Sequence, residues 1–123
     1  EGTESFQIGE LTLTVSRTAR DFGEIPEKKY TKWFDYDKIK NSPCVRTRRQ
    51  GDYLTVNSEG GRKKLNRIFI DEKIPAGLRD QIPVVAAGSE ILWIPGGRMN
   101  EQYKITSTTG RVLELHYQGG ALA

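Results

Sequence analysis

The spacing of the hydrophobic residues changes once along the chain, and this change limits the possible folds most strongly. In residues 10–17 apolar side chains alternate with Thr and Ser, which is typical of a half-buried β-strand. In residues 63–72 the apolar positions Leu65, Ile68 and Phe69 are three and four residues apart, which predicts one face of a helix. We therefore expect a helix over 63–72 in a chain made mostly of strands.

Shorter apolar runs, separated by glycine and proline, predict the remaining elements. The predicted strands lie at residues 30–39, 44–49, 53–56, 84–87, 90–95, 102–107 and 111–117. Hairpins are expected at 84–95, around Gly88, and at 102–117, around Gly110. A loop is expected at 21–29 and a short second helix at 75–82. The predicted fold class is α+β, dominated by β, with one or two helices inserted mid-chain.

Length and composition predict one domain from a longer protein. A chain of 123 residues can bury one modest core. Met99 is the only methionine, so we interpret Glu1 as internal to a longer chain. Residues 1–29 are expected to be the end of a preceding linker or the first strand, 30–118 the domain itself, and 119–123 a frayed tail.

The chain shows no membrane or export signal. No apolar run approaches the roughly 20 residues of a membrane span, and the first residues do not resemble a signal peptide. Cys44 is the only cysteine, which excludes an intrachain disulfide or a Cys-based zinc site and favours a reducing compartment. We therefore expect a cytoplasmic protein without membrane contact.

Positive charge is concentrated in residues 44–67. The formal net charge of the whole chain is +3, yet this window alone holds seven basic and two acidic residues. Such a concentration is typical of a surface that binds an acidic polymer. Simple solvated surface charge is the open alternative. The basic residues are Arg46, Arg48, Arg49, Arg62, Lys63, Lys64 and Arg67, and the acidic ones are Asp52 and Glu59.

The stretch "VRTRRQGDYL" is the most arginine-rich part of this window. If it begins as a strand, Arg46 and Arg48 share one face about 7 Å apart, near the spacing of successive backbone phosphates. Arginine binds phosphate oxygens through two parallel hydrogen bonds. Asp52 is expected to fold back onto Arg49 or Arg46 as a turn anchor, and both roles can coexist.

The stretch "GGRKKLNR" places Lys63 and Lys64 at the predicted helix start, where cations oppose the helix dipole. A local rule broken in this way indicates a functional role, here phosphate contact. The spacing is not that of a nucleotide-binding P-loop. Solvated charge is again the alternative.

The other chemically capable residues favour structural roles. Asp35 and Asp37 could share a Mg²⁺ ion, but no third carboxylate has suitable spacing, so turn or salt-bridge roles are favoured. His116, the only histidine, is expected at the surface or packed. Trp93 is expected in the core, whereas Trp33 could be buried or stack on a base. No known catalytic motif is present, so no catalytic or metal centre is predicted.

Three stretches carry a resemblance to a known family: "FDYDKIKNSPCVRTRRQGDYL", "GGRKKLNRIFIDEKIPAGLRDQIPVV" and "EILWIPGGRMNEQYKIT". In order they contain Asp-x-Asp-Lys, Arg-x-Arg-Arg-x-Gly-Asp, Gly-x-Lys-Lys-Leu, Lys-Ile-Pro followed by Arg-Asp, and Leu-Trp-Ile. This order resembles the C-terminal domain of bacterial tRNA(Ile)-lysidine synthetase. The resemblance implies a compact, β-sandwich-like fold shared with a domain of phenylalanyl-tRNA synthetase β chains.

The resemblance also implies a function. The whole enzyme of this family uses ATP, with Mg²⁺, to attach lysine to the wobble cytidine of tRNA(Ile) with anticodon CAU. That chemistry belongs to an N-terminal domain, so no cofactor is expected in this fragment. The C-terminal domain is implied to be non-catalytic and to grip the tRNA near its acceptor stem. The expected tRNA contacts are Arg46, Arg48, Arg49, Lys63, Lys64 and Arg67, and the expected structural residues are Asp52, Arg79 and Asp80.

Two alternatives remain open at this point. The domain could be an interaction module that docks on its own catalytic domain or forms a homodimer, with the basic residues serving solubility. An exposed apolar patch away from the arginines would favour this interpretation. An independent small enzyme would require Asp35, Asp37 and His116 to meet in one deep pocket.

Overall fold

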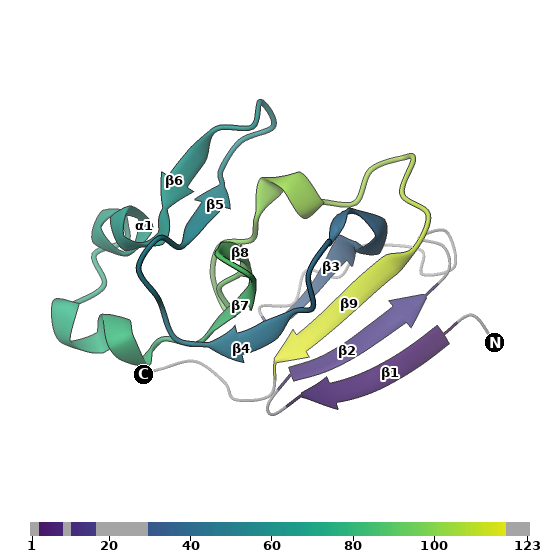
Figure 1. Cartoon of the computed structure of the whole chain (residues 1–123), viewed down its shortest axis with the longest axis horizontal. Helices are drawn as coiled ribbons and strands as arrows, with labels where there is room; N and C mark the ends of the chain where they lie inside the picture. The colour runs from purple at the N-terminus through teal and green to yellow at the C-terminus, as the bar shows by residue number, and fades with distance from the viewer. Residues whose placement is uncertain (1–2, 9–10, 17–29, 118–123) are drawn as a thin grey trace.

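The computed structural model describes residues 3–8, 11–16 and 30–117, and within them two β-sheets pack face to face (Figure 1). The first sheet is antiparallel and consists, in spatial order, of β1 (Thr3–Ile8), β2 (Leu11–Ser16), β9 (Val112–Tyr117) and β3 (Thr31–Asp35). The second sheet consists of β4 (Cys44–Arg46), β7 (Val84–Ala87), β8 (Glu90–Trp93), β5 (Tyr53–Thr55) and β6 (Arg62–Lys64). In the second sheet β5 and β8 run parallel and the other neighbours run antiparallel.

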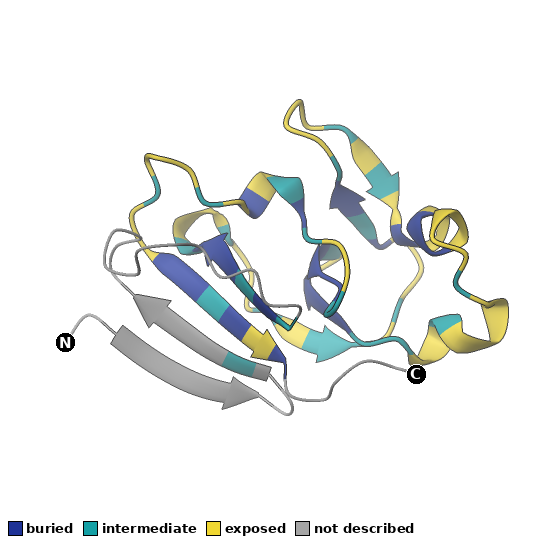
Figure 2. Ribbon diagram, turned by 180° about the vertical axis from the view of Figure 1, so that it is seen from behind, coloured by how far each residue is buried: buried dark blue, intermediate teal, exposed yellow. Residues whose placement is uncertain are grey.

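Strand β7 is apolar on both faces because it lies between two cores. All four of its residues are buried, as the dark strands in the middle of Figure 2 show. Val85 and Ala87 belong to the core between the sheets, and Val84 and Ala86 belong to a second core. An unbroken apolar run is the expected sequence of a strand covered on both sides.

The two cores divide the molecule into three layers. The core between the sheets contains Phe34, Leu92, Trp93, Leu113 and Leu115. The second core lies under α1 (Leu65–Asp71), whose Leu65, Ile68 and Phe69 pack against Leu54 and Ile91. The helical stripe predicted from the sequence is therefore the face that covers the second sheet.

Three short 3₁₀ helices complete the described part of the chain: η2 (Tyr36–Lys38), η3 (Ala76–Gln81) and η4 (Glu101–Tyr103). Pro75 caps the start of η3, where the sequence predicted a short helix beginning with proline. None of the helices described here is long and apolar enough to span a lipid bilayer.

The β-dominated sandwich with inserted helices is confirmed, as is the hairpin formed by β7 and β8. Several predicted elements differ from the structure. The strand predicted at 30–39 ends at Asp35, because η2 follows at Tyr36–Lys38. Residues 62–64 form β6 rather than the start of the helix, because they pair with β5. The strand predicted at 44–49 ends at Arg46, where its pairing with β7 ends. Residues 102–107 form no strand, since the chain makes η4 there, so the second predicted hairpin is absent.

Some predictions lie outside the described residues. These are the loop at 21–29 and the tail at 119–123. Within 1–29, β1 and β2 pair with each other and β2 continues the sheet beside β9, so this segment contributes strands to the domain.

Candidate functional site

A tight turn between β4 and β5 positions the arginines. The Asp52 N–H donates to the Arg49 carbonyl at 3.2 Å, and Asp52 Oδ2 accepts from the Arg49 N–H at 2.7 Å. Gly51, the third residue of the turn, has a φ of 94°, a conformation that favours glycine. The turn is therefore held from both sides, and the direction in which Arg49 leaves the backbone is fixed.

The side chain of Arg46 is nearly buried inside this turn. Its side chain is only 9% exposed and donates to both carboxylate oxygens of Asp52 at 2.8 Å. It also donates to the Gly88 carbonyl at 2.9 Å. The hydrogen bonds to Asp52 raise the pKa of the guanidinium, while burial acts in the opposite direction. Asp52 therefore anchors the turn, as the sequence predicted, and it does so by pairing with the Arg46 side chain.

Arg48 lies beyond the end of β4, so the expectation that it shares a strand face with Arg46 is wrong. Its Nε donates to Asp80 Oδ1 at 2.7 Å, and its Nη1 donates to Asn66 Oδ1. Asp80 belongs to η3 and Asn66 to α1, so Arg48 joins two helices to the turn. Arg79 does not pair with Asp80, because its Nε donates to the Ile74 carbonyl at 2.9 Å.

Strand pairing brings Lys64 to the same place. Lys64 lies opposite Tyr53 in the β5–β6 ladder, and the Leu65 N–H donates to the Asp52 carbonyl at 2.9 Å. The end of β6 is therefore tied to the turn that carries Arg49. The sequence predicted Lys63 and Lys64 at a helix start, but both belong to β6 and α1 begins at Leu65.

A pocket of about 450 Å³ opens where the turn, the start of α1 and η3 meet. Its lining contains the cationic side chains of Arg48, Arg49 and Lys64. The other lining residues are Gln50, Gly51, Asp52, Leu65, Asn66 and Asp80. A volume of this size is sufficient for a small ligand or one part of a larger one.

The cations around the pocket differ in how far acids neutralise them. Lys63 and Arg67 share Asp71, at 2.8 and 3.1 Å, and the hydrogen bond from Lys63 is the main cause that lowers the pKa of Asp71. Arg49 and Lys64 are exposed and form no ion pair with any residue that the structure describes. Arg49 and Lys64 are therefore the uncompensated charges of the pocket.

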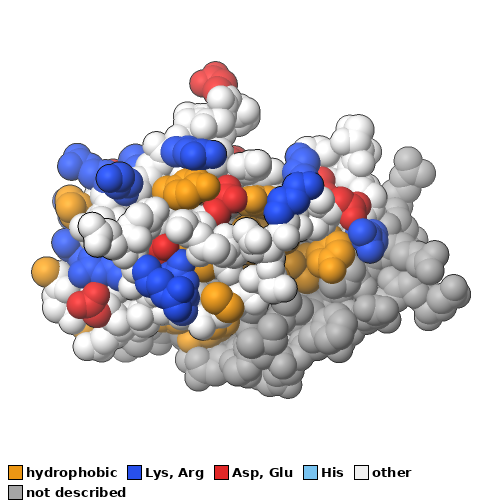
Figure 3. Space-filling model, viewed as in Figure 1, with side chains coloured by type: hydrophobic (Ala, Val, Ile, Leu, Met, Phe, Trp, Pro, Cys, Tyr) orange, Lys and Arg blue, Asp and Glu red, His pale blue; other side chains and the backbone are white. Residues whose placement is uncertain are grey.

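Arg62 lies on β6 with its guanidinium 4.6 Å from the centre of the Tyr53 ring. Figure 3 shows Lys and Arg side chains gathered toward the end of this face that carries α1 and β6. Of the basic residues in the window, Arg48, Arg49 and Lys64 line the pocket, Arg62, Lys63 and Arg67 lie on the adjoining β6 and α1, and Arg46 is nearly buried in the turn. The first six are called the basic surface around the pocket.

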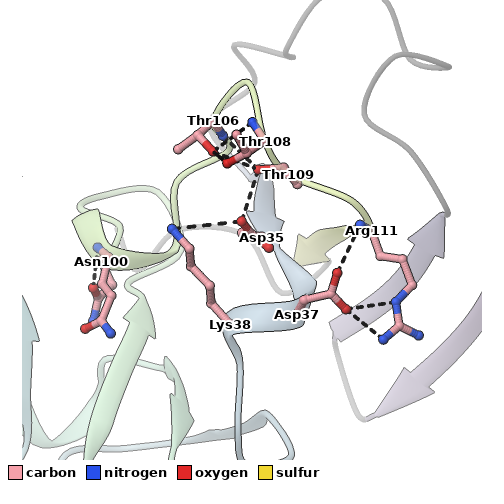
Figure 4. Close-up of polar contacts among 9 residues, drawn as sticks. Asp35, Asp37, Lys38, Asn100, Thr106, Thr108, Thr109 and Arg111 are labelled. Atoms are coloured by element: carbon pink, nitrogen blue, oxygen red, sulfur yellow. Dashed lines mark hydrogen bonds and ion pairs between the residues drawn. The ribbon is translucent and has the colours of Figure 1, made fainter.

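A second polar cluster lies between η2 and the segment before β9 (Figure 4). Asp35 accepts from Thr109 Oγ1 at 3.1 Å and lies 3.9 Å from Lys38 Nζ. Asp37 lies 2.7 Å from Nη2 of Arg111. Of the turn or salt-bridge roles predicted for these aspartates, the salt-bridge role is confirmed for both.

The remaining candidates lie away from the pocket. Trp93 is fully buried, as predicted, and Trp33 is only 7% exposed, so it does not offer a stacking surface. His116 is exposed on β9, with Nδ1 2.8 Å from Thr31 Oγ1. Among the residues described, no three His, Cys, Asp or Glu side chains are arranged to hold a metal ion.

Asn66 and Gln50 line the pocket although no sequence pattern marked them as part of the site. Asn66 follows the first helical residue, and its polar side chain there indicates an outward position. Its partner Arg48 is 18 residues earlier and is brought to it only by tertiary packing. No local pattern contains that information.

Fold and site together define a small three-layer β-sandwich domain with a cationic pocket on its helical side. A solved structure titled "Crystal structure of TILS C-terminal domain" matches this fold with a TM-score of 0.66 and 27% sequence identity. The match covers 97% of this chain and 92% of the other.

Sequence comparisons identify the same family and name the enzymes that contain this domain. The family model "TilS substrate C-terminal domain" matches residues 44–115. A tRNA(Ile)-lysidine synthase from Caldanaerobacter subterraneus subsp. tengcongensis is 49% identical over 88 residues, covering 72% of this chain and 19% of the relative. The synthase of Clostridium tetani is 41% identical over 90 residues, covering 73% of this chain and 19% of the relative. The chain thus spans about a fifth of the length of these relatives.

The chain belongs to the TilS substrate C-terminal domain family. Its relatives are tRNA(Ile)-lysidine synthases, and it corresponds to their C-terminal domain alone. The resemblance found in the sequence is confirmed.

Proposed function

We propose that this domain holds tRNA(Ile) for a tRNA(Ile)-lysidine synthase through the basic surface around the pocket. The parent enzyme is proposed to attach lysine to the wobble cytidine of the tRNA with anticodon CAU. ATP, with Mg²⁺, and lysine are assigned to its N-terminal domain, and the enzyme is placed in the cytoplasm. The observation that carries the proposal is the pair of exposed, uncompensated cations, Arg49 and Lys64, beside one pocket.

Uncompensated cations favour a polyanionic partner for a physical reason. Each phosphate that a Lys or Arg neutralises releases condensed counterions, which makes binding favourable and dependent on salt. A cation already paired with an aspartate contributes less, because the ion pair must be broken first. Arg49 and Lys64 meet this requirement, Arg62, Lys63 and Arg67 extend the surface, and Arg46 is assigned to structure alone.

The test uses the full-length synthase carrying Arg49→Ala together with Lys64→Ala. The KM for tRNA is expected to rise about tenfold with kcat little changed, since charged contacts are lost in docking and not in the chemical step. The logarithm of the tRNA binding constant falls linearly with the logarithm of the salt concentration, and the steepness of this line is expected to decrease by about two in the variant.

The matched control is Lys40→Ala together with Arg98→Ala. It removes the same two charges at exposed positions outside the pocket lining, so the KM for tRNA should stay near that of the unmodified enzyme. An unchanged KM in the folded Arg49→Ala/Lys64→Ala enzyme contradicts the proposal.

A second function has one observation in its favour. Ile70 of α1 and Leu78 of η3 are 45% and 38% exposed. These side chains could dock on the catalytic domain of the same enzyme or on a second copy. Such a role predicts that the Ile70→Ser/Leu78→Ser variant binds the catalytic domain, or a second copy of this domain, more weakly. The salt dependence of tRNA binding should not change.

A further inference from the structure

We propose that the pocket receives the terminal phosphate monoester of the RNA chain, its 5′ phosphate, rather than a phosphate within the duplex. This inference rests on the proposed tRNA-binding function. It assigns the pocket one chemical group, and it separates the pocket from the basic surface around it.

The shape of the site favours a chain end. The phosphates of a duplex lie on a continuous ridge and contact a protein along an open face. A pocket of about 450 Å³ instead admits a group that projects from the nucleic acid. Lys63, Arg62 and Arg67 lie outside the pocket lining and are left for the continuous backbone.

The charge of the pocket fits a phosphate monoester. Asp52 lines it, but its carboxylate is already occupied by Arg46 and by the Arg49 N–H. Asp80 also lines it and is paired with Arg48. Two positive charges remain, on Arg49 and Lys64. A phosphate monoester carries about −1.5 to −2 charges and three acceptor oxygens, whereas an internal diester carries a single charge.

One donor of the pocket, Arg48, is held in place before any ligand arrives. Arg48 is fixed by Asp80 at 2.7 Å and by Asn66 Oδ1. Because the Asn66 oxygen accepts from Arg48, its amide N–H groups remain available as donors at the pocket wall. Nη2 of Arg48 forms no hydrogen bond with any residue that the structure describes, so this nitrogen remains able to donate to a phosphate oxygen.

The experiment compares tRNA(Ile) that carries a 5′ phosphate with the same tRNA that carries a 5′ hydroxyl, binding to the full-length synthase. The phosphorylated tRNA is expected to bind about tenfold more tightly, because a dianion meets two uncompensated cations. In the Arg49→Ala/Lys64→Ala enzyme the two affinities should become nearly equal. In the Lys40→Ala/Arg98→Ala enzyme the difference should persist.

The outcomes separate this inference from the proposed function. If both tRNAs bind the unmodified enzyme equally, and binding still weakens in the Arg49→Ala/Lys64→Ala enzyme, the domain binds tRNA but the pocket does not receive the 5′ phosphate. If trimming the 3′ end weakens binding and the 5′ group has no effect, the pocket belongs to the other terminus and the inference is wrong. If the Arg49→Ala/Lys64→Ala enzyme binds both tRNAs as the unmodified enzyme does, the proposed function fails as well.

Discussion

The pocket and the η2–β9 cluster are built from the same residue types, yet only the pocket retains free positive charge. In the cluster, Lys38 lies beside Asp35 and Arg111 beside Asp37. In the pocket, Arg48 is paired with Asp80, while Arg49 and Lys64 are unpaired within the described chain. The number of basic residues therefore does not distinguish these two regions of the molecule. The charge left after internal pairing does.

The strongest test of this comparison is Asp52→Ala, which removes the internal partner of Arg46. The variant should lose about 3 kcal/mol of unfolding free energy, because it leaves a nearly buried guanidinium without its carboxylate. Denaturant unfolding followed by circular dichroism measures the loss. Asp80→Ala is the control, and since Asp80 is 78% exposed the expected loss is below about 1 kcal/mol. Equal losses in the two variants would mean that Asp52 is not the anchor of the turn.

A smaller effect is expected from increasing the free charge beside the pocket. Asp71→Asn releases Lys63 and Arg67, so tRNA should bind the full-length synthase about threefold more tightly at low salt. Titration of labelled tRNA at two salt concentrations measures the change. Asp37→Asn makes the same charge change in the other cluster and should leave affinity unaltered. Equal tightening by both variants would show that only net charge matters.

The smallest effect concerns the ionisation of Asp71 itself. Its pKa is lowered by Lys63 and then by Arg67, so it should stay ionised as pH falls past the point where ordinary aspartates protonate. The pKa of Asp71 is therefore lower in the folded state than in the unfolded state. Its ion pairs with Lys63 and Arg67 stabilise the fold fully at a pH above the unfolded-state pKa, and this stabilisation is lost as the pH falls through the folded-state pKa. Carboxyl chemical shifts followed by NMR report the pKa. Lys63→Ala should raise it, and a pKa insensitive to Lys63→Ala speaks against the pairing.

Much of this architecture could be predicted from the sequence. The alternation in residues 10–17 and the apolar run at Val84–Ala87 predicted strands correctly, because side-chain spacing follows directly from strand geometry. The stripe of Leu65, Ile68 and Phe69 predicted the covering helix. The start of that helix was misplaced because Lys63 and Lys64 pair with β5, which is a tertiary contact.

The site was less predictable than the fold for a similar reason. The sequence located the arginines, and it also proposed Asp52 as a turn anchor for Arg49 or Arg46. It could not show that the Arg46 side chain forms the ion pair with Asp52 while the Arg49 side chain forms none, since both arginines lie within six residues of that carboxylate. Nor could it bring Asn66 and Asp80 to Arg48, because their contacts depend on the packing of α1 and η3.

The parallel pairing of β5 with β8 has a consequence for how the domain folds. A parallel pair cannot close through a short hairpin, so the chain between Thr55 and Glu90 must be placed before the two strands join. Contacts of such long sequence separation form late, after local hairpins and helices. The same separation applies to one wall of the pocket, because Asp80 reaches Arg48 across 32 residues, whereas the turn of Arg49 and the β5–β6 pair that carries Lys64 are local. During synthesis, a chain that has not yet released Asp80 from the ribosome therefore has its arginines and Lys64 but lacks one wall of the pocket.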